Sequence, residues 1–394
     1  MTDPTDTTGP TGSRLGRALR TGIDCDPAHG AVAPPVYLSS TFTFAGYGES
    51  RQYDYTRSGN PTRDLLAQAV ATLEGGADGV ITSSGLSALT LIVTSLLRTG
   101  DTLVIPHDCY GGSWRLFRHL AAQGHFLVEP VDLTDTASAV RRIGELDPAM
   151  VLLETPSNPL LRLTDLAAVS EAAHRTDAIV VADNTFCSPI LQRPLELGAD
   201  LVLHSTTKYL NGHSDMVGGV VIAADAEMAA ETKRWANVLG LTASPFDSYL
   251  ALRGLRTIDA RMRVHQENAE AVVEALVGHP AVAAVHYPGL PDHPGHDIAA
   301  RQQDGFGAMV SFDLHGSESA AKAFVEGLTF FSLAESLGGI ESLVAHPATM
   351  THAAMSAEAL AVAGVGGGLL RLSVGIEPAV DLVADIQAGL ARAS

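Results

Sequence analysis

Short apolar runs rich in β-branched residues alternate with alanine-rich stretches of helical period between about residues 60 and 225. This alternation restricts the fold because strand–helix–strand units build a largely parallel sheet with helices on both faces. The predicted strands are 79–82, 102–105, 126–131, 150–154, 179–183, 201–204 and 218–223, and the predicted helices include 85–97, 114–123 and 165–174. The expected fold class is therefore α/β with a mostly parallel seven-stranded sheet. Ligands of such sheets bind beyond the carboxyl ends of the strands.

A second, smaller unit is expected in the C-terminal part of the chain. The length of 394 residues fits two domains. Residues 226–275 have a mostly helical pattern, and proline and glycine cluster at 276–296. Strands near 307–314 and 369–374 and a final helix near 378–392 predict an α+β unit.

Charge and composition exclude several classes of protein. A formal charge of −19 argues against nucleic acid and anionic membrane surfaces as partners. No stretch approaches the ~20 apolar residues of a membrane span. Residues 1–13 lack the apolar core of a secretory signal, so we expect a disordered tail. Cys25, Cys109 and Cys187 form no disulfide framework, which favours a reducing cytoplasm.

The segment 200–215 points to a specific chemistry. An apolar run ends in Ser205 and Thr207, whose hydroxyls suit a phosphate, and Lys208 follows in a chain with few lysines. A desolvated lysine attacks carbonyl groups, so the combination favours pyridoxal 5′-phosphate (PLP) held as a Schiff base. Asp183 ends a buried-type strand 25 residues earlier and can pair with the pyridinium nitrogen. The plainer alternative is a turn-capping Asp183 and a surface Lys208.

Other segments supply candidate groups around such a cofactor. Ser84, Gly85 and Leu86 form a strand–helix turn whose amides suit an anion. Tyr110 can stack on a ring or lie in the core, and Asn158 follows another buried strand. Arg371 within an apolar strand needs a carboxylate, from either a substrate or the protein.

Further motifs argue against rival cofactors. His286, His293 and His296 lack a convincing further ligand, so we expect no metal. The glycines at 364–369 do not form the dinucleotide fingerprint, because Leu369 occupies the third glycine position.

Taken together, these segments resemble the Cys/Met-metabolism family of PLP-dependent enzymes from about residue 17 to the end. The matching motifs are Tyr-Thr-Arg-Ser-Gly-Asn-Pro at 55–61, Ser-Ser-Gly-Leu at 83–86, Asp-Cys-Tyr-Gly-Gly at 108–112, Glu-Thr-Pro-Ser-Asn-Pro at 154–159, Asp-Asn-Thr at 183–185, His-Ser-Thr-Thr-Lys-Tyr at 204–209 and Leu-Ala-Glu-Ser-Leu-Gly-Gly at 333–339. The resemblance implies PLP-dependent fold type I, the aspartate-aminotransferase type. It divides the chain into an N-terminal tail and arm (1–60), a large PLP-binding domain (61–255) and a small C-terminal domain (256–394).

The resemblance also implies roles for individual residues. Lys208 would form the Schiff base and move protons, Asp183 would pair with the ring nitrogen, and Tyr110 would stack on the ring and assist proton transfer. The implied phosphate ligands are Ser84, Gly85, Leu86, Ser205 and Thr207, with Tyr55 and Arg57 reaching in from an adjacent subunit of a dimer of dimers. The implied substrate-binding residues are Asn158, Ser336 and Arg371, with Arg115 and Glu335 near the distal part of the substrate.

The resemblance implies γ-replacement as the activity: the cysteine thiol displaces the acyloxy group of an O-acylated homoserine to give cystathionine. The alternative is γ-elimination from cystathionine or a related thioether, giving cysteine, α-ketobutyrate and ammonia; a remote alternative is a non-catalytic PLP-binding protein. Relatives that use O-succinylhomoserine often carry a second arginine after Arg57, where this chain has Ser58. Losing such a contact costs about 2 kcal/mol, which leaves the acyl group open.

Overall fold

The computed structural model describes residues 12–351, 353, 360 and 363–394. Its larger sheet has seven strands in the order β1-β7-β6-β5-β4-β2-β3. Six strands run the same way, and β7 lies antiparallel to both of its neighbours. The strands are β1 (Asp78–Thr82), β2 (Thr102–Pro106), β3 (Leu127–Val131), β4 (Met150–Glu154), β5 (Ile179–Asp183), β6 (Leu201–Ser205) and β7 (Gly219–Ala223). The predicted mostly parallel seven-stranded sheet is confirmed, and each predicted strand ends within two residues of its observed position.

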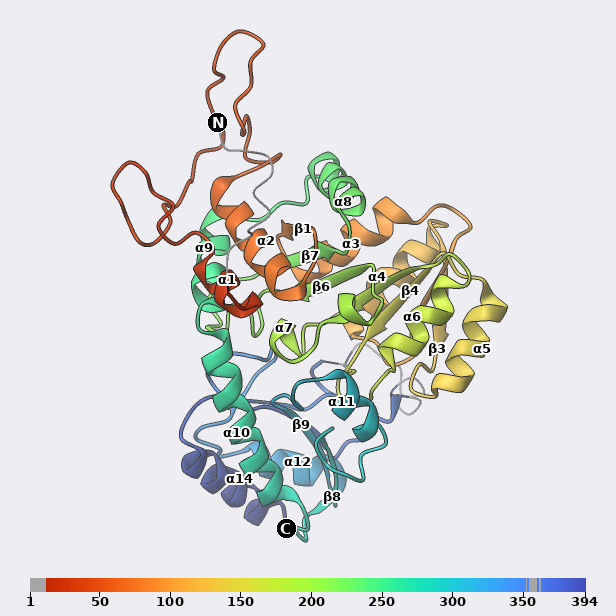
Figure 1. Ribbon diagram of the computed structural model, residues 1–394. Helices are drawn as coiled ribbons and strands as arrows, with labels where there is room; N and C mark the ends of the chain where they lie inside the picture. The colour runs from red at the N-terminus through yellow and green to blue at the C-terminus, as the bar shows by residue number, and fades with distance from the viewer. Residues whose placement is uncertain (1–11, 352, 354–359, 361–362) are drawn as a thin grey trace.

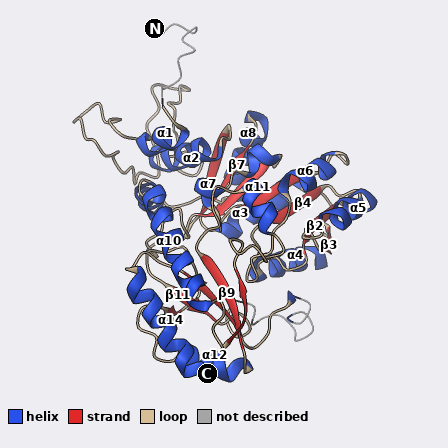
Figure 2. Ribbon diagram, turned by 60° about the horizontal axis from the view of Figure 1, so that its bottom comes forward, coloured by secondary structure: helices blue, strands red, loops and turns tan. Residues whose placement is uncertain are grey.

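Helices cover both faces of this sheet, as Figures 1 and 2 show. Alternate residues of each central strand enter opposite cores because side chains on a strand point alternately to its two faces. Leu152 and Val181 pack with α3, α4 and α8, whereas Leu153 and Val180 pack with α5 and α6 on the other face. The helices of this part are α1 (Arg14–Arg20), α2 (Pro61–Glu74), α3 (Gly85–Leu96), α4 (Gly111–Ala122), α5 (Thr136–Leu146), α6 (Leu166–His174), α7 (Ser188–Leu191), the 3-10 helix η1 (Pro194–Leu197), α8 (Ala226–Leu239) and α9 (Pro245–Leu255).

The second sheet has five strands in the order β10-β11-β12-β9-β8 and is antiparallel apart from the β10–β11 pair. Its strands are β8 (Val282–His286), β9 (Met309–Leu314), β10 (Ser332–Leu333), β11 (Leu343–Ala345) and β12 (Leu369–Ser373). The accompanying helices are α10 (Ile258–Leu276), α11 (His296–Gln302), α12 (Ser317–Val325) and α14 (Ala379–Ala393). The predicted C-terminal α+β unit is thus observed.

Helix α10 links the two parts of the molecule (Figure 1). Ile258 and Met262 lie in a core with α2 and α9, whereas Val272 and Leu276 lie in the core of the small sheet. The predicted boundary at residue 255 falls just before this helix, and the division into domains stays a prediction.

Residues 22–60 form long loops that project from the body near α1 and α2 (Figures 1 and 2). Their regular pairing consists of the isolated bridges Thr41–Tyr55 and Gly46–Glu49. Most of the tail predicted at 1–13 lies outside the described residues, whereas Ser13 caps α1. In the described ranges no helix combines the length and the apolar character that crossing a membrane requires.

Candidate functional site

A cavity of about 280 Å³ opens where the carboxyl ends of β4, β5 and β6 face the small sheet. The parallel strands of an α/β sheet place such openings at this edge. The cavity brings together eleven of the predicted site residues: Ser84, Gly85, Leu86, Tyr110, Asn158, Asp183, Ser205, Thr207, Lys208, Ser336 and Arg371.

Lys208 lies in the turn after β6 and extends into this cavity. Its Nζ donates a hydrogen bond to Ser336 Oγ across 2.6 Å. Burial, and then the positive charge of Arg371, lower the pKa of Lys208 to about 8, against a smaller opposing effect of Glu335. A larger fraction of neutral amine is therefore present near neutral pH than for an ordinary lysine, which makes Lys208 a better nucleophile and base.

Arg371 comes from β12 of the small sheet and is almost completely buried. Its guanidinium donates to Asn158 Oδ1 at 2.8 Å and to the carbonyl oxygen of Ser336 at 2.9 Å. Its Nε is buried and makes no hydrogen bond within the described part of the chain. Burial lowers the pKa of Arg371 to about 10. Both paired oxygens are neutral, and among the described residues no carboxylate forms an ion pair with Arg371, so this cation suits an anionic ligand.

Asp183 ends β5 beside the cavity. Its Oδ1 accepts a hydrogen bond from the backbone N–H of Thr185 at 2.9 Å, and Thr185 Oγ1 accepts one from the backbone N–H of Ser205 at 3.0 Å. Burial raises the pKa of Asp183, while the Thr185 hydrogen bonds and the charge of His204 oppose this rise. The ends of β5 and β6 are thereby fixed relative to each other around one carboxyl group.

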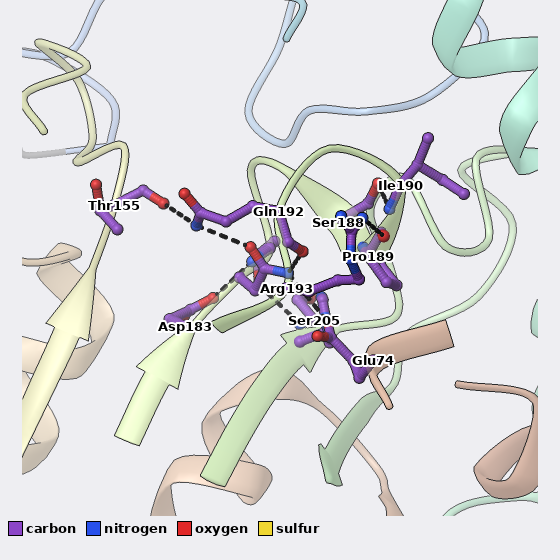
Figure 3. A network of polar contacts seen from close by, with 12 residues as sticks. Glu74, Thr155, Asp183, Ser188, Pro189, Ile190, Gln192, Arg193 and Ser205 are labelled. Atoms are coloured by element: carbon purple, nitrogen blue, oxygen red, sulfur yellow. Dashed lines mark hydrogen bonds and ion pairs between the residues drawn. The ribbon is translucent and has the colours of Figure 1, made fainter. Parts of the chain in front are cut away.

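A buried polar network supports these strand ends from behind (Figure 3). Asn184 Nδ2 donates to Glu74 Oε1 at 2.9 Å, and His204 Nε2 lies 2.6 Å from the same oxygen. Gln192 Nε2 donates to the carbonyl of Thr155 and to Asn184 Oδ1, both at 3.1 Å. The network joins β4, β5 and β6 to the last residue of α2.

The N-terminus of α3 faces the same cavity. Ser84 caps the helix by accepting a hydrogen bond from the backbone N–H of Ser87 at 3.0 Å. A Cβ atom on Gly85 would lie 3.1 Å from Ser205 Cβ, so glycine lets the helix end approach β6. The amides of the first turn, with the Ser205 and Thr207 hydroxyls, form a site suited to a phosphate.

Tyr110 precedes α4, and its side chain is 41% exposed at the cavity. Its backbone N–H donates to Glu154 Oε2 at 2.9 Å. The cavity therefore combines a lysine with a lowered pKa, a buried carboxyl, a phosphate-binding helix end, an aromatic ring and a buried guanidinium. This set suits a phosphorylated aldehyde together with an amino acid carboxylate.

Four predicted site residues do not line this cavity. Tyr55 and Arg57 lie on the projecting loops, where Arg57 donates to the carbonyl oxygen and the Oδ1 of Asn237 on α8 of its own chain. Arg115 is exposed on α4. Glu335 lines an adjoining cavity of about 510 Å³ that shares Thr207, Val217 and Ser336 with the first.

The structure also adds residues that the sequence did not assign to the site. Glu154, Thr185 and Phe186 line the cavity, together with Ser113, Pro156, Val217 and Leu337. Glu154 and Thr185 stand inside the recognised motifs, so motif position was a signal that could have found them. The described residues contain no group of three His, Cys, Asp or Glu side chains arranged to hold a metal ion.

Comparisons with known proteins agree with this geometry. A model of the family described as Cys/Met metabolism PLP-dependent enzyme matches residues 16–391. Cystathionine γ-synthase of Escherichia coli is 54% identical over 377 residues, which cover 96% of this chain and 97% of that protein. A crystal structure of cystathionine γ-synthase from Xanthomonas oryzae pv. oryzae in complex with cystathionine has 63% identity and a TM-score of 0.96, covering 98% of this chain and 99% of that one. Cystathionine γ-lyase from Lactobacillus plantarum, complexed with L-serine, has 40% identity and a TM-score of 0.92, covering 96% and 99%.

Proposed function

The chain belongs to the Cys/Met metabolism family of PLP-dependent enzymes, and from this membership we propose that it joins cysteine to an O-acylated homoserine to give cystathionine. The observation that carries the proposal is the position of Lys208 between two groups. Asp183 and the α3 terminus lie on the side of the large sheet, and Ser336 and Arg371 lie on the side of the small sheet. One amine thus has access to a cofactor site and to a substrate site.

PLP fits the groups present in this cavity. Ser84, Gly85, Leu86, Ser205 and Thr207 would hold its phosphate, Asp183 its ring nitrogen, Tyr110 its ring face and Lys208 its aldehyde carbon. When bound, PLP supplies an electron sink for the substrate's α-carbon. The Asp183 carboxylate would keep a proton on the ring nitrogen.

Lys208 would hold and move the proton of the substrate's α-carbon, since its lowered pKa of about 8 suits a base near neutral pH. Ser336 orients the amine through the 2.6 Å hydrogen bond. Tyr110 would assist a second proton transfer from the open side of the cavity, where its ring is partly exposed.

Arg371 would bind the α-carboxylate of the amino acid substrate, with Asn158 and Ser336 fixing the guanidinium. Glu335 in the adjoining cavity and Arg115 on α4 would contact the distal part of the substrate. Exclusion of water from the reacting carbon would then favour replacement by the cysteine thiol over elimination.

Elimination is the second candidate, giving cysteine, α-ketobutyrate and ammonia from cystathionine. The similarity to the L. plantarum γ-lyase supports it, because the two chains match over nearly their full lengths. The two reactions share their early steps and require the same lysine.

We also propose a homotetramer that functions in the cytoplasm. The projecting loops expose Val32, Tyr37, Leu38, Phe44 and Tyr47, which is the apolar surface expected of a subunit contact. In such an assembly Tyr55 and Arg57 would reach the phosphate site of a neighbouring subunit. Gel filtration that finds a fully active monomer would contradict this arrangement.

A product assay tests the activity. PLP-loaded protein receives O-succinyl- or O-acetylhomoserine with and without cysteine, or cystathionine alone, and mass spectrometry follows cystathionine and α-ketobutyrate. Cystathionine formed from an acylated homoserine and cysteine supports the synthase. Rapid α-ketobutyrate release from cystathionine, with little synthesis, would establish the γ-lyase instead.

A further inference from the structure

Glu154 places a second carboxyl group beside Asp183 at the floor of the cavity. The two residues are aligned partners on the neighbouring parallel strands β4 and β5. Residues in register on adjacent strands point to the same face, so both side chains lie on the face covered by α3 and α4. Glu154 is only 7% exposed, yet it lines the same cavity as Asp183.

Glu154 also contacts the segment that carries Tyr110. Its Oε2 accepts the backbone N–H of Tyr110 at 2.9 Å, immediately before α4 begins. The backbone amide of Asn158 is a further hydrogen-bond donor to this carboxyl. The Glu154 side chain therefore connects two residues to the strand beside Asp183: Tyr110, expected at the ring face, and Asn158, which holds the Arg371 guanidinium.

The surroundings of the two carboxyls differ in charge. Burial, Asp183 and Asp108 raise the pKa of Glu154, against the hydrogen bonds from the two amides. Cys109 is also close, and Asp108 is itself paired with Arg162 at 3.2 Å. Asp183 has the hydrogen bonds of Thr185 and the charge of His204 to favour its ionised form. Two adjacent buried carboxyls disfavour two negative charges, and these surroundings favour the proton on Glu154 over Asp183.

We propose that Glu154 is a positioning residue that acts as a neutral carboxylic acid, fixing Tyr110 over the cofactor site and leaving the negative charge of this pair on Asp183. The inference rests on the proposed function, because it assumes that PLP occupies the cavity. It differs from a role in proton transfer, in which Glu154 would have to ionise during each turnover.

The test compares Glu154→Gln and Glu154→Leu with the parent protein and with Glu129→Gln, which changes a partly exposed glutamate on β3 as a matched control. Glutamine keeps an oxygen acceptor for the Tyr110 amide and carries no charge, whereas leucine removes the acceptor. The measurements are PLP affinity by absorbance titration, visible circular dichroism of the bound cofactor, kcat and KM across pH, and the infrared band of a protonated carboxylic acid.

We expect Glu154→Gln to stay within about threefold of the parent in PLP affinity and kcat, with an unchanged pH profile and loss of one protonated-carboxyl infrared band. We expect Glu154→Leu to lower kcat by about 10- to 100-fold and to change the visible circular dichroism, because the Tyr110 amide loses its partner. If Glu154→Leu does not fold, the glutamine variant and the infrared band still decide.

Three results would overturn the inference while leaving the proposed function intact. A loss of 100-fold or more in Glu154→Gln with normal PLP binding would assign Glu154 to proton transfer. An infrared spectrum that the glutamine substitution does not change would show that Glu154 is not a neutral acid. A folded Glu154→Leu equal to the parent in every measurement would remove any positioning role. A parent protein that fails to bind PLP would instead overturn the proposed function itself.

Discussion

The side-chain nitrogen of Lys208 donates a hydrogen bond to the hydroxyl of Ser336 across 2.6 Å, although 128 residues separate the two in the chain. Lys208 follows a strand of the large sheet, and Ser336 lies in the loop between β10 and β11 of the small sheet. The contact therefore makes the orientation of the amine depend on how the small sheet packs against the large one.

Replacing Ser336 by alanine is expected to lower kcat/KM by about 10-fold, since one hydrogen bond to a charged group contributes about 1.5 kcal/mol. Ser336 has a φ of 90°, which glycine adopts more easily than alanine. Ser336→Gly should lose the same activity while unfolding at a higher urea concentration than Ser336→Ala. Steady-state kinetics and urea titrations measure both effects. Full activity in the glycine variant would show that the hydroxyl has no role.

Lys208→Ala is expected to reduce turnover by at least about 1,000-fold, because none of the other described residues that line the cavity is both a nucleophile and a base with a lowered pKa. The variant should also lack the absorbance band near about 420 nm that PLP shows when attached to a lysine. Lys233→Ala is the control, since Lys233 is a partly exposed residue paired with Asp78. Borohydride reduction followed by peptide mass spectrometry should place the cofactor on Lys208 and on neither Lys233 nor Lys322.

Attachment of PLP to the cofactor-free protein should depend on the pKa of Lys208. This pKa is lowered to about 8, so the reactive neutral amine increases as pH rises through 8 and dominates above it. Arg371→Met removes one of the causes of that lowering, so the midpoint of the rate–pH curve should move upward. Stopped-flow absorbance measures the rate. Arg263→Met, at an exposed site on α10, should leave the midpoint unchanged.

The buried polar network around Glu74 should contribute strongly to the free energy of unfolding. Glu74→Leu leaves His204 and Asn184 buried without their shared acceptor, and breaking a buried charged contact costs about 3–5 kcal/mol. Glu171→Leu, which removes an exposed pair with Arg175 on α6, should change the free energy of unfolding by less than about 1 kcal/mol. Urea unfolding followed by circular dichroism compares the variants. Equal losses of the free energy of unfolding in Glu74→Leu and Glu171→Leu would show that the buried network contributes no more to stability than the exposed ion pair.

The sequence predicted the strands well because each is a continuous apolar run bounded by turn residues, as with β4 and β5. It also predicted which strand ends hold the reactive side chains, since Asp183 ends one such run and Lys208 follows another. Sequence patterns did not reveal that β7 runs antiparallel between β1 and β6, because pairing direction depends on contacts distant in the chain.

The sequence failed to predict some contacts of the site for the same physical reason. The contact of Glu74 with His204 joins residues 130 positions apart, and no local pattern encodes it. Glu154 ends a buried strand as Asp183 does, and only the register of β4 and β5 shows that the two carboxyls are neighbours. The positions of Tyr55 and Arg57 relative to a cofactor stay predictions, because both belong to residues 22–60, which form loops that project from the body of the chain.

The acyl group of the substrate should depend on Ser58. Its hydroxyl has two acceptors within hydrogen-bond distance, Asp54 Oδ1 at 2.7 Å and the carbonyl oxygen of Tyr55 at 2.6 Å. Ser58 therefore stabilises its own loop and offers no positive charge to a distal carboxylate. We therefore expect O-acetylhomoserine to be used at least as well as O-succinylhomoserine. Ser58→Arg adds a cation beside Arg57 and should raise kcat/KM for the succinyl ester relative to the acetyl ester by about 10- to 30-fold, which corresponds to about 1.4–2 kcal/mol.

Ser58→Gln is the matched control for this substitution, because it adds length without charge and should leave the ratio of the two kcat/KM values nearly unchanged. Competition between the two esters in one reaction, with both leaving groups quantified by mass spectrometry, measures that ratio directly. Added salt should reduce the gain in Ser58→Arg, since a partly exposed charge pair is screened. A ratio that Ser58→Arg does not change would show that the loop carrying Ser58 does not approach the distal end of the substrate.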